Sequence, residues 1–336
     1  MHPNQLFIEK SEKILRTRPK GCCYLLYLDI TDFQYINFCY GTEAGDRLLK
    51  AVNDYTAGLP FVLLCERLYS DYFLCILSFP GEAPDEKAVQ AVEHSLNGFM
   101  AEQQKLYPAC KLRFACGLCR TGTQELSHTI ESANLARKEA KRLDTGSAVL
   151  YSEELVQKTV TRYELEQTLN QAVREQRFCF YLQPKVDLTN GRIIGAEALA
   201  RRIGQDGTVI YPDSFLPVME SSGTVVELDL LICRQVCAFL SGRLRQGLPV
   251  VRTSVNLSRL HIKNKDTASS LHAIAQEYQI PPELLEFELT ETILLDELTG
   301  AKKLIDQLRT YGYRVSIDDF GSGYAGINIW QELNFD

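Results

Sequence analysis

Residues 314–324, RVSIDDFGSGY, place two adjacent carboxylates, Asp318 and Asp319, directly after a short apolar run. The run at 315–317 predicts a buried strand, and the glycines after it permit a tight loop. Neighbouring acids repel each other unless a cation or solvent compensates them, although such a pair is by itself more often a solvated turn. Alone, this pair therefore does not define a metal site.

The same arrangement recurs upstream on three further apolar runs. Glu197 lies in IIGAEAL, Asn256 in SVNLS and Glu288 in LLEFEL, with Glu291 three residues later. From Glu197 to Asn256, to Glu288 and on to Asp318 the intervals are 59, 32 and 30 residues. A (β/α)8 barrel uses roughly 30 residues per strand–helix unit and keeps its chemistry at the carboxyl ends of the strands. The spacing therefore predicts a barrel that presents these oxygen atoms on one rim.

The chemistry of this set points to a hard divalent cation. Carboxylate and amide oxygens prefer Mg²⁺ or Mn²⁺ over metals that favour sulfur or imidazole. Two such ions would lower the pKa of a bridging water and neutralise phosphoryl oxygens. Each acid taken singly is more often a solvated strand end or a helix cap than a ligand. The spacing of the whole set favours ligation: Glu197, Asn256, Glu288, Asp318 and Asp319.

The composition and charge of the chain limit the classes of protein to which it can belong. The chain has 336 residues, 45% of them hydrophobic and 24% charged, which is ordinary globular material for two domains. A formal charge of −7 argues against binding a nucleic-acid polymer or an anionic membrane surface. Since no apolar run approaches the roughly 18 residues of a membrane span and the N-terminus lacks a signal pattern, we expect a cytoplasmic protein. Its eleven cysteines, including Cys116 and Cys119 of a CxxC pair, are then predicted to be reduced thiols, with that pair in the core.

Periodicity divides the chain into three parts. Residues 1–152 form an α/β pattern, residues 153–177 are charged and free of glycine and proline, and residues 178–336 carry the acids. The middle part predicts a connecting helix. Strands are predicted at 24–28, 61–65, 72–77, 112–118 and 148–151, and helices at 43–55, 87–103 and 125–142.

The first part resembles a GGDEF domain, of the diguanylate cyclase-like family. LDITDFQYIN, GTEAGDRLL and ANLARKEAK match three family stretches, with Asp29, Phe33 and Asn37 kept. The resemblance implies a nucleotidyl-cyclase-like central sheet. It leaves open residual metal or nucleotide binding, GTP included, through Asp29, Asn37, Asp46 and Asp71.

The signature of that family is altered in this chain. Where the family has Gly-Gly-Asp-Glu-Phe, the chain has Tyr69-Ser70-Asp71-Tyr72-Phe73. Glycines there let backbone approach phosphate, so Tyr69 and Ser70 remove that access. Tyr72 replaces the family's catalytic carboxylate, and the upstream Arg-x-x-Asp inhibition motif is absent. We therefore expect no diguanylate cyclase activity but a scaffold that regulates or dimerises, with a homodimer left open.

From Phe178 onward the chain resembles an EAL domain, of the cyclic di-GMP phosphodiesterase family. FYLQPKVDL, YPDSFLPVMESSG, SVNLS, LEFELTET and SIDDFGSGYAG follow in family order. The resemblance implies a TIM-type barrel whose first strand is antiparallel to the rest. It also implies that Arg201 grips substrate phosphate, Gln183 lies near the substrate, and Glu291 fastens the loop 319–324. The implied metal ligands are the five residues with the spacing given above, with catalytic roles for Glu197, Asp318 and Asp319.

The sequence ends at Asp336, inside a family run whose lysine would follow. We count five barrel strands, around Phe180, Ala196, Val255, Phe287 and Ser316, so we expect an incomplete barrel and an inactive polypeptide if the chain ends there. The predicted family function is metal-dependent hydrolysis of cyclic di-GMP to linear pGpG in bacterial second-messenger signalling. The alternative is a non-catalytic receptor for cyclic di-GMP or GTP, or a protein-interaction module. The intact metal set favours the enzyme, and the missing lysine favours the receptor.

Overall fold

The computed structural model describes residues 3–19, 21–79, 85–122, 124–290 and 298–318. The chain divides into two compact units, residues 1–160 and 161–336. The division falls within helix α6 (Glu153–Arg174). Among the helices of the described residues, none is both long and apolar enough to cross a membrane.

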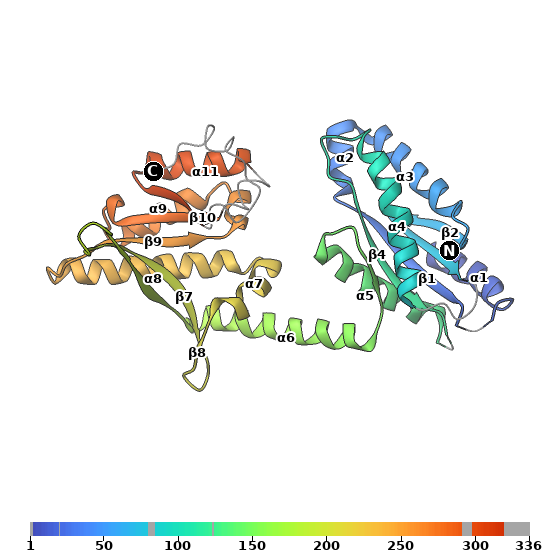
Figure 1. Ribbon diagram of the computed structural model, residues 1–336, viewed down its shortest axis with the longest axis horizontal. Coiled ribbons are helices and arrows are strands. Elements are labelled where there is room, and N and C mark those ends of the chain that lie inside the picture. Colours follow the sequence, from blue (N-terminus) through green and yellow to red (C-terminus); the bar gives the residue numbers. More distant parts are fainter. Residues whose placement is uncertain (1–2, 20, 80–84, 123, 291–297, 319–336) are drawn as a thin grey trace. The chain divides into compact units, whose positions relative to one another are not determined.

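The first unit, drawn in blue to green in Figure 1, is built on a five-stranded sheet in the order β2-β3-β1-β4-β5. All neighbouring strands pair antiparallel except β4 and β5, which are parallel. The strands are β1 (Cys23–Thr31), β2 (Val62–Tyr69), β3 (Tyr72–Ser78), β4 (Arg113–Arg120) and β5 (Ala148–Leu150). The five strands predicted in this part of the chain are therefore present, most of them longer than their apolar runs indicated.

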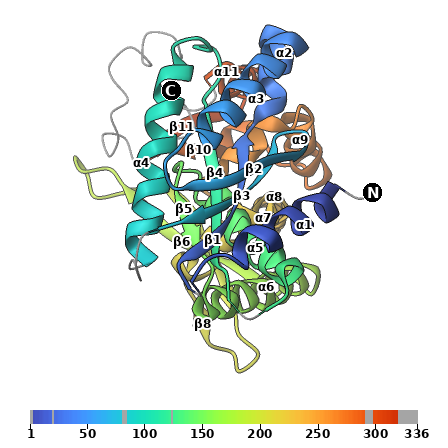
Figure 2. The same cartoon turned by 90° about the vertical axis from the view of Figure 1, so that its right-hand side faces the viewer.

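Helices cover both faces of this sheet: α1 (Pro3–Leu15), α2 (Phe33–Tyr40), α3 (Thr42–Ala57), α4 (Asp85–Gln104) and α5 (Leu126–Leu143). Side chains alternate along a strand, so Leu26 and Leu28 join the core beneath α3 and α4, while Leu25 and Tyr27 join the core beneath α1 and α5. In Figure 2, α4 and α1 accordingly lie on opposite sides of β1. This double burial explains why β1 is apolar almost throughout. Cys116 and Cys119 are buried in β4, which confirms their predicted place in the core.

The second unit has a sheet in the order β11-β10-β9-β7-β6, with the short β8 paired to β7. Strand β6 is antiparallel to β7, whereas β7, β9, β10 and β11 are parallel to one another. The strands are β6 (Phe178–Val186), β7 (Ile193–Ile203), β8 (Val209–Ile210), β9 (Arg252–Leu257), β10 (Leu285–Thr290) and β11 (Arg314–Asp318). The helices are α7 (Leu216–Ser222), α8 (Val225–Arg245), α9 (Thr267–Glu277) and α11 (Leu298–Thr310), with 3₁₀ turns at Pro212–Ser214, Arg259–Lys263 and Pro282–Leu284.

Strand alternation separates an apolar face from a polar face in this unit. Val255, Phe287 and Val315 point into one core with residues of α8, α9 and α11. Their neighbours in sequence, such as Asn256 and Glu288, point to the opposite face. Helices α8, α9 and α11 connect successive parallel strands (Figure 1), so the carboxyl ends of β7, β9, β10 and β11 lie at one edge.

Candidate active site

Three carboxylates from three different strands meet at that edge. Glu197 of β7, Glu288 of β10 and Asp318 of β11 each bring one oxygen atom to within 4.8 Å of the others. Strand register brings this about, because Glu288 lies beside Ser316 of β11 and Asp318 lies two residues further along, beside Thr290. Residues 121 positions apart in sequence thereby form one acidic cluster.

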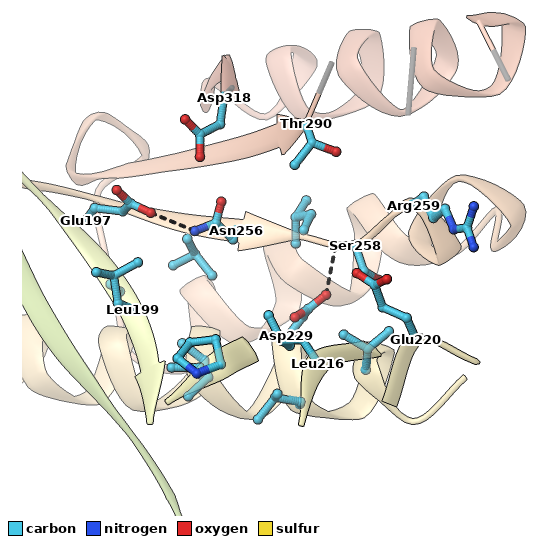
Figure 3. Close-up of a pocket in the computed structure, with 18 residues that line it drawn as sticks. Glu197, Leu199, Leu216, Glu220, Asp229, Asn256, Ser258, Arg259, Thr290 and Asp318 are labelled. Atoms are coloured by element: carbon cyan, nitrogen blue, oxygen red, sulfur yellow. Dashed lines mark hydrogen bonds between the residues drawn. The ribbon is translucent and has the colours of Figure 1, made fainter. Parts of the chain in front are cut away.

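Asn256 completes the cluster from β9, where it lies directly beside Glu288 in the register. Its side-chain nitrogen donates a 2.8 Å hydrogen bond to Oε1 of Glu197. That bond fixes the orientation of the Asn256 amide group, and Figure 3 shows the amide oxygen on the side of Asp318. The cluster therefore presents an amide oxygen together with three carboxylates.

Glu288 is the most enclosed member of the cluster, at 5% exposure. Burial raises the pKa of its carboxyl group, and the nearby charge of Glu197 acts in the same direction, whereas Lys185 opposes the shift. Lys185 of β6 contacts Oε1 of Glu288 through its ammonium group, while Oε2 has no hydrogen-bond partner among the described residues. One orphaned carboxylate oxygen thus remains in a buried, negatively charged setting.

These observations fit a hard divalent cation. A buried carboxylate oxygen without a partner is costly unless a cation or donor meets it. The ammonium of Lys185, which pairs with Glu288, supplies a single positive charge beside three carboxylates. The donor set is entirely oxygen, as Mg²⁺ and Mn²⁺ prefer. Asp319, predicted to reach a second ion, and Glu291, predicted to fasten the following loop, both lie outside the described residues.

A pocket of about 560 Å³ opens from this cluster (Figure 3). Glu197, Asn256 and Asp318 line one end, and its walls carry apolar residues such as Leu199 and Leu216. Further polar residues line it: Glu220, Asp229, Ser258, Arg259 and Thr290. Cavities of this size with apolar walls and a few grouped polar atoms are typical of small-molecule sites.

Arg201 and Gln183, the predicted substrate contacts, are not among the residues that line this pocket. Gln183 is exposed on β6, directly opposite Glu197 in the antiparallel register. The Arg201 guanidinium lies over the rings of Tyr181 and Tyr211, 5.5 and 4.8 Å from their centres. Such stacking holds a guanidinium in place while leaving N–H groups for an anion.

In the first unit, Asp29 lies on the face of β1 that α5 covers. Its carboxylate is fully buried and contacts the guanidinium of Arg137, while Lys141 donates to it at 3.1 Å. Burial raises the pKa of Asp29, although both cations oppose that shift. Gly117 makes the contact possible, because a Cβ there would lie 1.9 Å from the carbonyl oxygen of Ala133. Helix α5 therefore packs close enough on the sheet to place cationic groups on this acid.

Aromatic residues enclose the same guanidinium. Arg137 lies over the rings of Tyr27 and Tyr72, 5.3 and 5.1 Å from their centres. Tyr72 is the residue that stands in place of the family glutamate, so its ring now covers an internal cation. The altered signature forms the β2–β3 turn, where Ser70 has a φ of 48° and donates to Asp71.

The remaining signature residues and the other predicted nucleotide-binding positions differ in their exposure. Phe73 is fully buried and Tyr69 is 57% exposed. Asn37 is half-buried on α2 beneath Gly45, where a Cβ would lie 2.0 Å from its side-chain oxygen. Asp46 is exposed on α3. Asp46 therefore lies exposed to solvent, whereas Asp29 lies in a buried cluster of charged groups.

Sequence reasoning missed two cations, Lys185 and Arg137. Lys185 follows Gln183 by two residues on a strand, and a period of two would have placed both on one face. Arg137 lies one helical turn before Lys141, and that spacing puts both on one face of α5. Neither spacing identifies the carboxylate with which each cation pairs, since that pairing depends on the tertiary fold.

Family comparisons agree with the two units. The sequence profile of the EAL domain matches residues 166–336, and that of the diguanylate cyclase GGDEF domain matches residues 3–146. The chain therefore belongs to the EAL domain family and carries a GGDEF domain before its EAL domain. The predicted fold, a GGDEF-like α/β domain followed by a domain of the TIM-barrel class, is confirmed.

Individual relatives match either most of this chain or half of it. Signaling protein YkoW of Bacillus subtilis is 28% identical over 313 residues, which cover 92% of this chain and 39% of YkoW. Probable cyclic di-GMP phosphodiesterase PdeB of Escherichia coli is 36% identical over 168 residues, covering 50% of this chain and 32% of PdeB. This chain thus spans less than half the length of these relatives.

Among solved structures, the S helix-GGDEF-EAL region of Vibrio cholerae LapD, bound to c-di-GMP, aligns with a TM-score of 0.54. It is 14% identical, and the alignment covers 98% of this chain and 77% of that one. At this identity the likeness shows the fold alone.

Proposed function

We propose that the EAL domain hydrolyses cyclic di-GMP to the linear dinucleotide pGpG in a metal-dependent reaction. The observation that carries this proposal is the meeting of Glu197, Glu288 and Asp318 within 4.8 Å, with Asn256 beside them, at the mouth of the pocket. The 36% identity to PdeB, whose name is that of a probable cyclic di-GMP phosphodiesterase, supports the choice of substrate.

We assign each of these residues a role in holding the metal ions. Glu197, Asn256, Glu288 and Asp318 would hold Mg²⁺ or Mn²⁺, and we propose that Asp319 reaches a second ion. Metal ions in such a site activate water and neutralise charge on the phosphoryl oxygens. Asn256 and Glu197 hold each other in position through their hydrogen bond.

The residues around the cluster would position the substrate. Arg201, stacked on two tyrosines, would donate to a nonbridging phosphate oxygen, with Gln183 alongside on β6. The apolar walls beside Leu199 and Leu216 would receive a base. Glu291 is proposed to anchor the loop that carries Asp319.

Removal of divalent metal tests the proposal. Incubation of the protein expressed from its whole gene, with any residues that follow Asp336, together with cyclic di-GMP and Mn²⁺ should yield pGpG, separated by liquid chromatography. Excess EDTA should abolish the product because the carboxylates alone cannot activate water. Mg²⁺ or Mn²⁺ added back should restore turnover. Undiminished turnover in EDTA would refute a metal-dependent mechanism.

We further propose that the GGDEF domain makes no cyclic di-GMP. Two observations support this: Tyr69, Ser70 and Tyr72 replace the signature residues, and the Asp29 carboxylate is held by Arg137 and Lys141. A carboxylate already paired with two internal cations has little capacity left for a metal–triphosphate complex. A regulatory or dimerising role, with or without weak GTP binding, is the function that remains for this domain.

Incubation with GTP and Mg²⁺ is the corresponding test. No cyclic di-GMP should form over hours, while an active diguanylate cyclase assayed in parallel accumulates it. The EAL domain must be disabled in this assay by Glu197→Gln, so that any product survives to be detected. Product above the GTP-free blank would contradict the proposal, and calorimetry with GTP reports binding separately.

A further inference from the structure

Two thiols face each other across the β2–β3 hairpin of the first unit. Cys65 and Cys75 are directly paired in the antiparallel register, and the Cys75 thiol donates to the sulfur of Cys65 at 3.2 Å. Cys65 is partly exposed, whereas Cys75 is fully buried. One residue of the pair thus lies partly open to solvent, and the other is enclosed in the core.

The backbone already meets the requirements of a disulfide. Directly opposed residues of an antiparallel pair have Cα atoms roughly 4.5–5.5 Å apart, within the range of about 4.4–6.8 Å found in disulfides. The sulfur atoms need to move together by little more than 1 Å from their present 3.2 Å. Side-chain rotation within the hairpin therefore suffices, without a shift of either strand.

The location gives such a bond a structural consequence. Strand β2 lies at one edge of the sheet, and β3 is its single strand partner among the described residues. The ladder between these strands is irregular near Val62 and again near Arg67. A covalent bond between Cys65 and Cys75 would fix the edge strand at a point between the two irregularities and close the ring that contains the turn at Ser70.

We propose that Cys65 and Cys75 are a redox modification site, which peroxide converts into a reversible intramolecular disulfide. Hydrogen bonding to Cys65 and burial both raise the pKa of Cys75, so Cys65 is the thiol that meets the oxidant. Its thiolate attacks the O–O bond of hydrogen peroxide to form a sulfenic acid and release water. The sulfur of Cys75 then attacks that of Cys65 and displaces a second water. In balance, two thiols lose two protons and two electrons, and one peroxide becomes two waters.

Tryptic mapping tests this directly, because cleavage after Arg67 separates the two cysteines. Cys65 is the sole cysteine of peptide 51–67, and Cys75 is the sole cysteine of peptide 68–87. After peroxide treatment of the full-length protein and alkylation of free thiols, these peptides should be recovered as one species lighter than their sum by two hydrogens. Dithiothreitol should separate them.

The same digest contains a matched control. Cys233 and Cys237 lie one turn apart on α8, and cleavage after Arg234 separates them as well. Side chains at this spacing have Cβ atoms about 5–6 Å apart, beyond the roughly 3.5–4.5 Å of a disulfide. They should not cross-link. Cys65→Ser, at the partly exposed position, should abolish the 51–67/68–87 species.

Thermal unfolding gives a second readout on the same samples. The oxidised wild-type protein should unfold about 5–10 °C above the reduced protein in the transition of the first unit, and Cys65→Ser should show no such difference. Recovery of Cys65 as an alkylated or overoxidised single peptide, or equal cross-linking at Cys233 and Cys237, would overturn the proposal.

Discussion

Replacing Glu197 by glutamine should lower the rate of cyclic di-GMP hydrolysis by at least about 100-fold. The substitution keeps the shape of the side chain but removes one of three carboxylates that lie within 4.8 Å of one another. It also places an amide against Asn256, whose nitrogen now donates to Glu197. The loss should appear in turnover number, measured with Mn²⁺ at saturating substrate, with Mn²⁺ affinity reduced in calorimetry.

Glu277→Gln is the matched control for this substitution. It removes the same charge from the same unit, but at an exposed position of α9 where Glu277 pairs with Arg234. An exposed pair of this kind contributes little, so activity and metal affinity should remain within twofold of wild type. If both Glu197→Gln and the Glu277→Gln control retained most of the wild-type activity, the assignment of the metal ligands would be wrong.

Replacing Arg137 by methionine should destabilise the first unit by about 3–5 kcal/mol, because it leaves a buried charge without its main partner. Asp29 is fully buried, and Arg137 itself is 6% exposed. Lys141, which is more exposed, would remain as the single ion-pair partner of that carboxylate among the described residues. Chemical denaturation followed by circular dichroism measures the change in free energy of unfolding.

Arg142→Met is the control from the same helix. Arg142 pairs with Glu139 on the surface of α5, so its loss should cost less than about 1 kcal/mol. The double variant Asp29→Asn with Arg137→Met should recover part of the stability, since no unpaired charge is then buried. A single Arg137→Met variant as stable as wild type would show that the pair does not hold α5 on the sheet.

Much of the second domain could be predicted from local pattern. Glu197, Asn256, Glu288 and Asp318 each lie in a short apolar run, and their intervals match strand–helix units of a barrel. Strand periodicity then fixes the face on which each side chain lies. The three carboxylates converge because their strands are parallel and paired in register. The intervals between the acids in the sequence fit such an arrangement of strands.

The internal cations could not be predicted in the same way. Lys185 meets Glu288 across 103 residues, and Arg137 meets Asp29 across 108. Such pairs depend on how closely two elements pack, as the approach of α5 over Gly117 shows. Helices α1 and α2 were also not predicted; α2 is only eight residues long, too short for periodicity to stand out.

The most direct test of the central claim measures binding and turnover of cyclic di-GMP in one preparation of the protein expressed from its whole gene, with any residues that follow Asp336. Calorimetry in Ca²⁺ would report binding, and chromatography with mass detection after exchange into Mn²⁺ would report product. The account predicts binding followed by pGpG, heavier than cyclic di-GMP by one water. Binding without any linear product in Mn²⁺ would contradict it and identify the EAL domain as a receptor.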